Sequence, residues 1–196
     1  MTQIKKNIGL VREKIRIAAE SSGRKEYNIK LVAITKLATL EQAKEAINCG
    51  VTAIGESRVQ IAEEKLPKLG GVEKHMVGSL QTNKAKLAVE LFDVIQSVDS
   101  VRLAKEINRR AKDNGKIMPV FVEVNIAGEE SKSGVPPEDV PDFCNHLLKL
   151  TNIRVEGLMT IAPYAAPEQA RPYFRNMKKL FDPLKLKWLS MGMTND

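Results

Sequence analysis

Lys36 is the residue whose type and position most clearly suggest chemistry. It follows residues 31–35, an apolar, β-branched segment with the composition of a buried strand. A lysine at the end of such a strand is expected to be partly desolvated, which disfavours the ammonium form and lowers its pKa. A neutral amine attacks aldehydes and ketones to form a Schiff base. Lys36 is therefore a candidate for covalent attachment of a carbonyl compound.

Other kinds of site have weaker signals. The two histidines, His75 and His146, have no carboxylate or cysteine at metal-ligand spacing, so a metal site is not expected. Neither a P-loop nor a Ser/His/Asp arrangement can be identified. Residues 128–134 have the glycines and hydroxyls of an anion-holding loop, but a flexible solvated loop is the favoured interpretation. Two chemistries stay open for Lys36: a Schiff base with a substrate, as in aldolases, or with pyridoxal 5'-phosphate (PLP).

The composition is that of an ordinary globular protein. Of 196 residues, 43% are hydrophobic and 28% are charged, which is enough for one well-buried domain over residues 1–196. The net charge of +7 suits a small anionic ligand such as a phosphate ester. Only 5% of the residues are aromatic, so nucleic-acid binding is not expected. Two distant cysteines and the lack of a leader or membrane-spanning segment predict a cytoplasmic location.

The segments that must position Lys36 alternate between strand and helix patterns. An amphipathic helix comes first, with Gly23 as its expected stop. Thr39 and Gln42 have the spacing of a capping box, and Thr82 and Ser100 precede two further helices. The expected strands are residues 31–35, 52–55, 75–78, 94–98, 120–124, 155–160 and 188–190. The expected helices between them are residues 40–48, 59–66, 84–91, 101–113, 137–150 and 167–180.

Repeated strand–helix units predict a parallel sheet with helices outside it. A doubly wound sheet and a (β/α)8 barrel are both compatible with this order. No G-x-G-x-x-G follows the first strand, and most strands end in polar residues, so the barrel is favoured. Its active-site face would carry the residues that follow the strands. In chain order these are Lys36, Glu56, Ser57, Arg58, Ser79, Gln81, Asn83, Ser97, Asp99, Asn125, Met159, Thr160 and Ser190 to Thr194.

Seven short motifs stand in order along the chain. They read LVAITK, GVTAIGES, HMVGSLQTNK, IQSVDSVRLAKEINRRA, VFVEVNIAGEESKSG, VEGLMTIAP and LSMGMTND. In this order and spacing they resemble the family of pyridoxal phosphate homeostasis proteins. The resemblance covers the chain from the first strand to the last residue. It implies a TIM barrel of PLP fold type III, related to the barrel of alanine racemase, with an extra N-terminal helix.

The resemblance also implies a cofactor site. PLP would be held as a Schiff base on Lys36, and its phosphate would lie beside residues 190–193, with Ser190 as a side-chain donor. The other residues that the resemblance places at the cofactor are Asn83, Ser97, Asn125, Met159, Met191 and Gly192.

The sequence departs from the family pattern at two places. Where the family commonly reads G-E-N-Y, this chain has Gly55, Glu56, Ser57 and Arg58, so a contact from the usual asparagine is not expected. The family continues past SMGMTND with a helix and an Arg-Ile-Gly-Thr strand that closes the barrel and adds phosphate contacts. Since the sequence stops at Asp196, we expect the last strand and helix to be missing, with two sheet edges uncovered.

The resemblance implies a non-catalytic protein that binds PLP, takes part in intracellular vitamin B6 homeostasis and hands the cofactor to PLP-dependent apo-enzymes, as a monomer or weak dimer. A racemase or decarboxylase of fold type III is one alternative. Such racemases carry a second domain whose tyrosine is the acid/base, and Tyr27, Tyr164 and Tyr173 do not match its motif. A cofactor-free Schiff-base aldolase is the other alternative, which an absorbance spectrum would distinguish.

Overall fold

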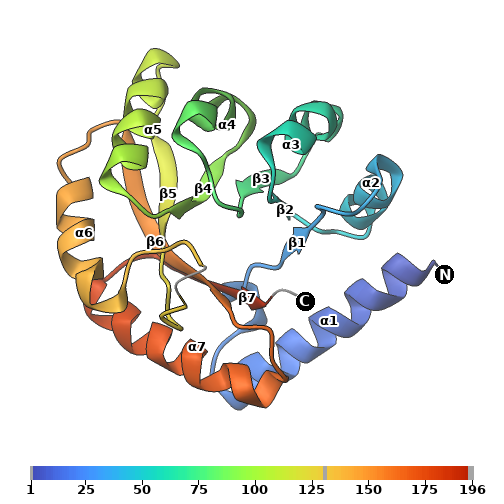
Figure 1. Ribbon diagram of the computed structural model, residues 1–196. Helices are drawn as coiled ribbons and strands as arrows, with labels where there is room; N and C mark the ends of the chain where they lie inside the picture. The colour runs from blue at the N-terminus through green and yellow to red at the C-terminus, as the bar shows by residue number, and fades with distance from the viewer. Residues whose placement is uncertain (1, 130–131, 194–196) are drawn as a thin grey trace.

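The computed structural model describes residues 2–129 and 132–193 and contains one curled sheet (Figure 1). The seven strands of this part of the chain are all parallel and lie side by side in chain order. They are β1 (Val32–Ile34), β2 (Ala53–Glu56), β3 (Glu73–Met76), β4 (Val94–Val98), β5 (Met118–Glu123), β6 (Ile153–Ala162) and β7 (Trp188–Met193).

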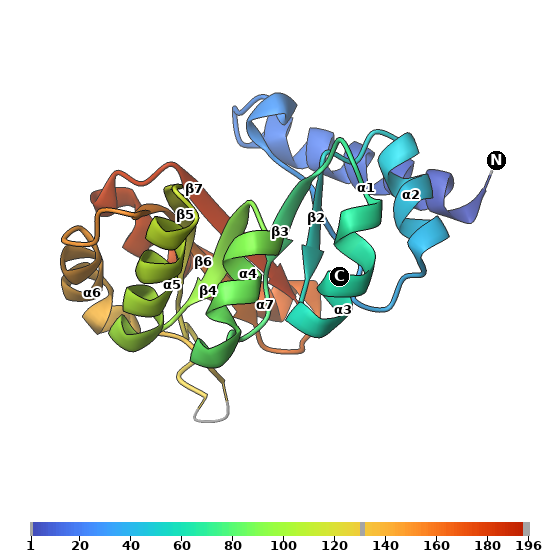
Figure 2. The same ribbon diagram turned by 90° about the horizontal axis from the view of Figure 1, so that it is seen from above.

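Helices α2 to α7 cover the convex side of this sheet, and α1 packs against α2 beside its open side, as Figure 1 shows; Figure 2 gives the view from above. The helices are α1 (Gln3–Ser21), α2 (Leu40–Asn48), α3 (Val59–Lys65), α4 (Ala85–Leu91), α5 (Val101–Asp113), α6 (Val140–Leu147) and α7 (Pro167–Phe181). Short 3-10 helices are η1 (Glu26–Asn28), η2 (Leu66–Lys68), η3 (Thr82–Lys84), η4 (Pro137–Asp139) and η5 (Asp182–Leu184). No helix in the described ranges has the length and apolar character needed to cross a bilayer.

The helix that follows Lys36 begins where its capping residues predict. The Thr39 side chain accepts from the Gln42 amide, and the Gln42 side chain accepts from the Thr39 amide at 2.8 Å. These two bonds satisfy N–H groups that a helix start leaves unpaired. Gly50, just after α2, has a φ of +86°, which glycine adopts at little cost.

Most of the apolar core lies between the sheet and its helices. Alternate strand residues such as Ile54, Ile95 and Leu158 pack there against helix residues such as Leu103 and Ile107. A smaller group, Val94, Phe121 and Met159 with Trp188, packs separately. Because neighbouring residues of a strand point to opposite faces, this smaller group belongs to the concave side of the sheet.

The predicted barrel with its last unit missing is confirmed. β1 and β7 are the two edges of the sheet, and no described strand joins them. The edges approach each other at their N-terminal ends, where the Lys30 amine lies 5.1 Å from the centre of the Trp188 ring. The concave side is therefore narrow at that end and bounded by all seven strands.

Several predicted boundaries were wrong. β3 is Glu73–Met76 and not residues 75–78, and the chain bends at Gly78, where a side chain would meet the Ser57 backbone. Thr82 does not cap α4, since residues 82–84 form η3 and the helix starts without a side-chain cap. The helix predicted at 137–150 is shorter and is preceded by η4.

Candidate functional site

Lys36 lies on the concave side of the sheet, just beyond β1. Ile54 and Ala33 pack on the helix side, whereas a Cβ on Gly55 would lie 2.6 Å from Ile34 Cδ1. Val32 and Ile34 therefore face the concave interior of the sheet. Lys36, two residues after Ile34, is on the same side, at the open end of the concave face, which we call the mouth. The side chain is exposed in a turn. The desolvation expected of Lys36 is thus not found, because the turn lifts it past the strand end.

A hydrogen-bonded chain of polar side chains crosses the concave interior below that mouth. Ser190 Oγ donates to Gln96 Oε1 at 2.7 Å, and Gln96 Nε2 lies 2.6 Å from His75 Nδ1. Since β4 and β7 are not neighbours in the sheet, the Ser190–Gln96 bond must span the interior. The bond pattern assigns the acceptor role to His75 Nδ1. Burial lowers the pKa of His75, which keeps this ring neutral.

Glu123 belongs to the same level of the interior. The sheet register places Glu123 beside Met159, and Met159 beside Ser190. The Glu123 side chain is buried. Its burial, and secondly the negative charge of Asp99, raise the pKa of this carboxyl to about 7. At neutral pH the carboxyl of Glu123 can therefore either donate or accept a proton.

Three buried polar atoms at the ends of β4 and β5 have no hydrogen-bond partner among the described residues. They are Ser97 Oγ, Glu123 Oε2 and Asn125 Oδ1. An unpaired buried polar group costs roughly 1–3 kcal/mol, and such groups in native proteins call for an explanation. A polar ligand bound at these strand ends would supply the missing partners. Ser97 Oγ can donate or accept, Asn125 Oδ1 accepts, and Glu123 Oε2 donates when protonated and accepts when ionised, so the set fits a ligand with both donors and acceptors, such as the ring nitrogen and hydroxyl of PLP.

Ser97 reaches this position through an irregularity of β4. The register with β5 shifts between Ile95 and Val98, and both of these residues pack in the core beneath the helices. In a regular strand, two residues that face the same side are separated by one or three residues. Ile95 and Val98 are separated by two, Gln96 and Ser97, which the irregularity accommodates. Gln96 and Ser97 are both almost completely buried.

Asn125 anchors the loop that follows β5. Its Nδ2 donates to the carbonyl of Glu129 at 2.9 Å, and its own amide donates to Val135 O. Ser133 Oγ donates to Ser79 Oγ at 3.4 Å, which links this loop to the one after β3. The described residues of segment 128–134, which the sequence predicts to be a solvated loop, are thus tied to the residues that follow β3 and β5.

The other predicted residues have different surroundings. Met159 is buried next to Ser190. Asn83 is exposed on η3. Met191 is 43% exposed on the edge strand, and Gly192 pairs with Ile161. Thr194, the last residue of the predicted run, lies outside the described residues.

Sequence reasoning missed Gln96, Glu123 and the pair Glu56–Lys65. The signal for the first two was present, because each is a polar residue inside an apolar strand sequence, VIQSV or VFVEV. The sequence predicts Glu56 only as one of the residues of the active-site face, without its partner. Lys65 gave no signal, since a lysine in a charged helix segment reads as a surface residue.

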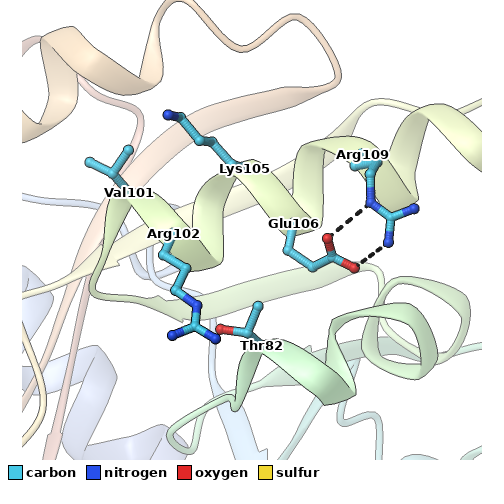
Figure 3. Close-up of a pocket in the computed structure, with 6 residues that line it drawn as sticks. All are labelled: Thr82, Val101, Arg102, Lys105, Glu106 and Arg109. Atoms are coloured by element: carbon cyan, nitrogen blue, oxygen red, sulfur yellow. Dashed lines mark hydrogen bonds and ion pairs between the residues drawn. The ribbon is translucent and has the colours of Figure 1, made fainter.

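A shallow groove of about 560 Å³ lies outside the ring of strands, between η3 and α5 (Figure 3). Its charged lining residues are Arg102, Lys105, Arg109 and Glu106, and Glu106 is paired with Arg109 and with the neighbouring Arg110. These two hydrogen-bonded guanidinium groups lower the pKa of Glu106 to about 2. The groove does not include Lys36, Gln96, Glu123 or Ser190, so it is not the candidate site.

Comparison with known proteins gives consistent matches over nearly the whole chain. The family model described as alanine racemase, N-terminal domain, matches residues 7–196. A pyridoxal phosphate homeostasis protein of Aquifex aeolicus is 42% identical over 195 residues, which cover 95% of this chain and 86% of that protein. The structure of PipY of Synechococcus elongatus PCC7942 without PLP is 31% identical, with a TM-score of 0.78, over 99% of this chain and 91% of PipY. The structure of PipY with PLP bound is 27% identical, with a TM-score of 0.72, over 97% of this chain and 98% of PipY.

Proposed function

Since the chain belongs to the family of pyridoxal phosphate homeostasis proteins, within the alanine racemase N-terminal domain family, we propose that it binds PLP and takes part in intracellular PLP homeostasis. The observation that carries this proposal is the position of Lys36. Its amine stands at the mouth of a concave face on which Ser97, Glu123 and Asn125 hold buried polar atoms without partners. The PLP-bound structure of PipY, which has the same fold, supports the proposal.

Lys36 is proposed as the covalent anchor. PLP supplies an aldehyde that condenses with amines and a ring that withdraws electrons. Lys36 would hold this aldehyde as a Schiff base: a C=N bond would form between its nitrogen and the aldehyde carbon, and the aldehyde oxygen would leave as water. Exposure of Lys36 at the mouth makes the amine accessible to a cofactor that arrives from solution.

The remaining predicted residues are proposed to hold the other parts of the cofactor. Ser190, Met191 and Gly192 would lie beside the phosphate, where a hydroxyl and backbone N–H groups can bind an anion. Ser190 must then exchange its bond to Gln96 for one to the phosphate, or keep it and bind through its backbone. Ser97, Asn125, Met159 and Asn83 would line the cavity.

A carrier role is proposed over catalysis. Amino-acid chemistry on PLP needs acid/base groups positioned on both faces of the cofactor. Tyr27 and Tyr164 are 83% and 73% exposed, and Tyr173 lies on α7 outside the sheet, so none of these three tyrosines stands beside the buried residues Gln96, Glu123 and Ser190. The bound cofactor would instead be passed to PLP-dependent apo-enzymes.

Racemase activity is the second candidate, because the matching family model is named after alanine racemase. The test is incubation of the PLP-loaded protein with alanine, serine or ornithine, followed by chiral analysis. The carrier proposal predicts no turnover beyond slow exchange. Racemisation near the enzyme median of about 10 per second would contradict it. A protein that forms a borohydride-trapped substrate adduct with no PLP absorbance would indicate the aldolase alternative.

A further inference from the structure

Lys65, the last residue of α3, is a buried lysine with a fully used ammonium group. The residue is 8% exposed. Its Nζ donates to the carbonyl oxygens of Thr35 at 2.7 Å and Ala38 at 3.1 Å, and to Glu56 Oε1 at 2.6 Å. An ammonium has three N–H donors, so each has one acceptor. Buried ion pairs of this kind contribute little net stability, which points to a role in fixing geometry.

The two carbonyls that Lys65 binds are the ends of the turn that carries Lys36. The amide of Ala38 donates to Thr35 O at 3.0 Å, which makes Thr35 and Ala38 the first and fourth residues of a β-turn. Lys36 and Leu37 are its two central residues. Leu37 is 91% exposed, so side-chain packing at the tip does little to hold the turn. Backbone hydrogen bonds and the Lys65 ammonium hold it.

Glu56 ties the same turn to β2. Its Oε1 accepts from Thr35 Oγ1 at 2.6 Å as well as from Lys65, and Glu56 has no exposed surface. The Thr35 amide donates to Gly55 O at 2.9 Å. The residue immediately before Lys36 is therefore fixed through its backbone amide, its carbonyl and its side chain.

We propose that Lys65, together with Glu56, is a positioning residue for Lys36. The pair fixes the turn so that the Lys36 amine meets an incoming carbonyl group in one orientation, without touching that group itself. This inference rests on the proposed function of Lys36. Removing the Lys65 ammonium leaves two turn carbonyls without their side-chain donor, so Lys36 samples more orientations and binds the cofactor less well.

Three variants test the proposal. Lys65→Met removes the ammonium but leaves the Glu56 charge buried. Lys65→Met with Glu56→Gln removes both charges and keeps an acceptor for Thr35 Oγ1. Lys68→Met is the matched control, because Lys68 is exposed on η2 three residues further on and the change in net charge is the same as for Lys65→Met.

Two measurements are made on each variant: hydrogen exchange at the Ala38 amide of the PLP-free protein, and PLP affinity from the absorbance of the covalent complex. The double variant is expected to regain stability against urea, yet to exchange Ala38 faster and to bind PLP more weakly, each by about tenfold. Lys68→Met should match the wild type in both.

A folded double variant with wild-type exchange at Ala38 and wild-type PLP affinity would overturn the proposal. A double variant that does not fold would also overturn it, because Lys65 would then have a structural role. The exchange measurement needs no cofactor. If the wild type forms no covalent complex with PLP, the proposed function fails, while Ala38 exchange still reports whether Lys65 holds the turn.

Discussion

At the scale of single residues, the site combines an exposed amine with a buried carboxyl. Lys36 is solvent-accessible, whereas Glu123 is buried beside Met159 and near the charge of Asp99. An exposed lysine is open to reaction, and a buried carboxyl that titrates near neutrality adapts its protonation to a ligand. Glu123 also makes the stability of the unliganded protein depend on pH.

Glu123 is expected to reduce stability as pH rises. Its pKa is about 7 in the folded protein against an ordinary value of 4.5, so the folded state binds the proton more tightly between these values. Stability from this group is present below pH 4.5 and is lost as pH rises through 7, by on the order of 3 kcal/mol. Glu123→Gln should remove this loss, which urea unfolding at pH 5 and pH 8 measures.

Glu63→Gln is the control for this comparison, because Glu63 is exposed on α3. It should change the free energy of unfolding equally at both pH values. If Glu123→Gln behaves like Glu63→Gln, the carboxyl of Glu123 is not held in the protonated form.

Some residues of the candidate site could be predicted from the sequence, and others could not. Lys36, Ser97 and Asn125 follow or end apolar strands, so their position at one end of the sheet could be predicted. The Ser190–Gln96 bond joins residues 94 positions apart and depends on the curvature of the sheet, which no local pattern encodes. Lys65 is buried only because α3 packs over the turn at Lys36, so its role is a product of tertiary structure.

At the scale of elements, the alternating pattern predicted all seven described strands, because a buried parallel strand is a continuous apolar run. The misplaced end of β3 shows the limit of this reasoning. Val77 is apolar, but Gly78 packs directly on the backbone of Ser57, and only the partner strand reveals that contact. The strand–loop junction near the site is therefore set by close backbone packing.

Gly78→Ala should accordingly be destabilising. An added Cβ would lie 2.2 Å from Ser57 O, and backbone atoms cannot move away without shifting the ends of β2 and β3. The expected loss is about 1–3 kcal/mol, measured by urea unfolding. Gly70→Ala is the matched control, because nothing lies within 4 Å of the added atom. Equal stability of the two variants would show that the junction is not tightly packed.

At the scale of the whole molecule, the curled sheet separates two environments. Its convex face is covered by helices and is apolar (Figure 1). Its concave face carries the layer of His75, Gln96, Glu123 and Ser190, and narrows where Lys30 meets Trp188. The open end of this concave face, at the strand ends that carry Lys36, is the side from which a ligand can approach.

The measurement that tests the central claim most directly is reduction of the PLP-treated protein with borohydride, followed by peptide mapping. Reduction fixes the cofactor on the lysine that holds it. We predict the pyridoxyl group on Lys36 and loss of the PLP absorbance band in Lys36→Ala, with the variant still folded because an exposed lysine leaves no cavity. A label found chiefly on Lys84 or Lys132, or a band that survives in Lys36→Ala, would contradict the assignment of Lys36 as the covalent anchor.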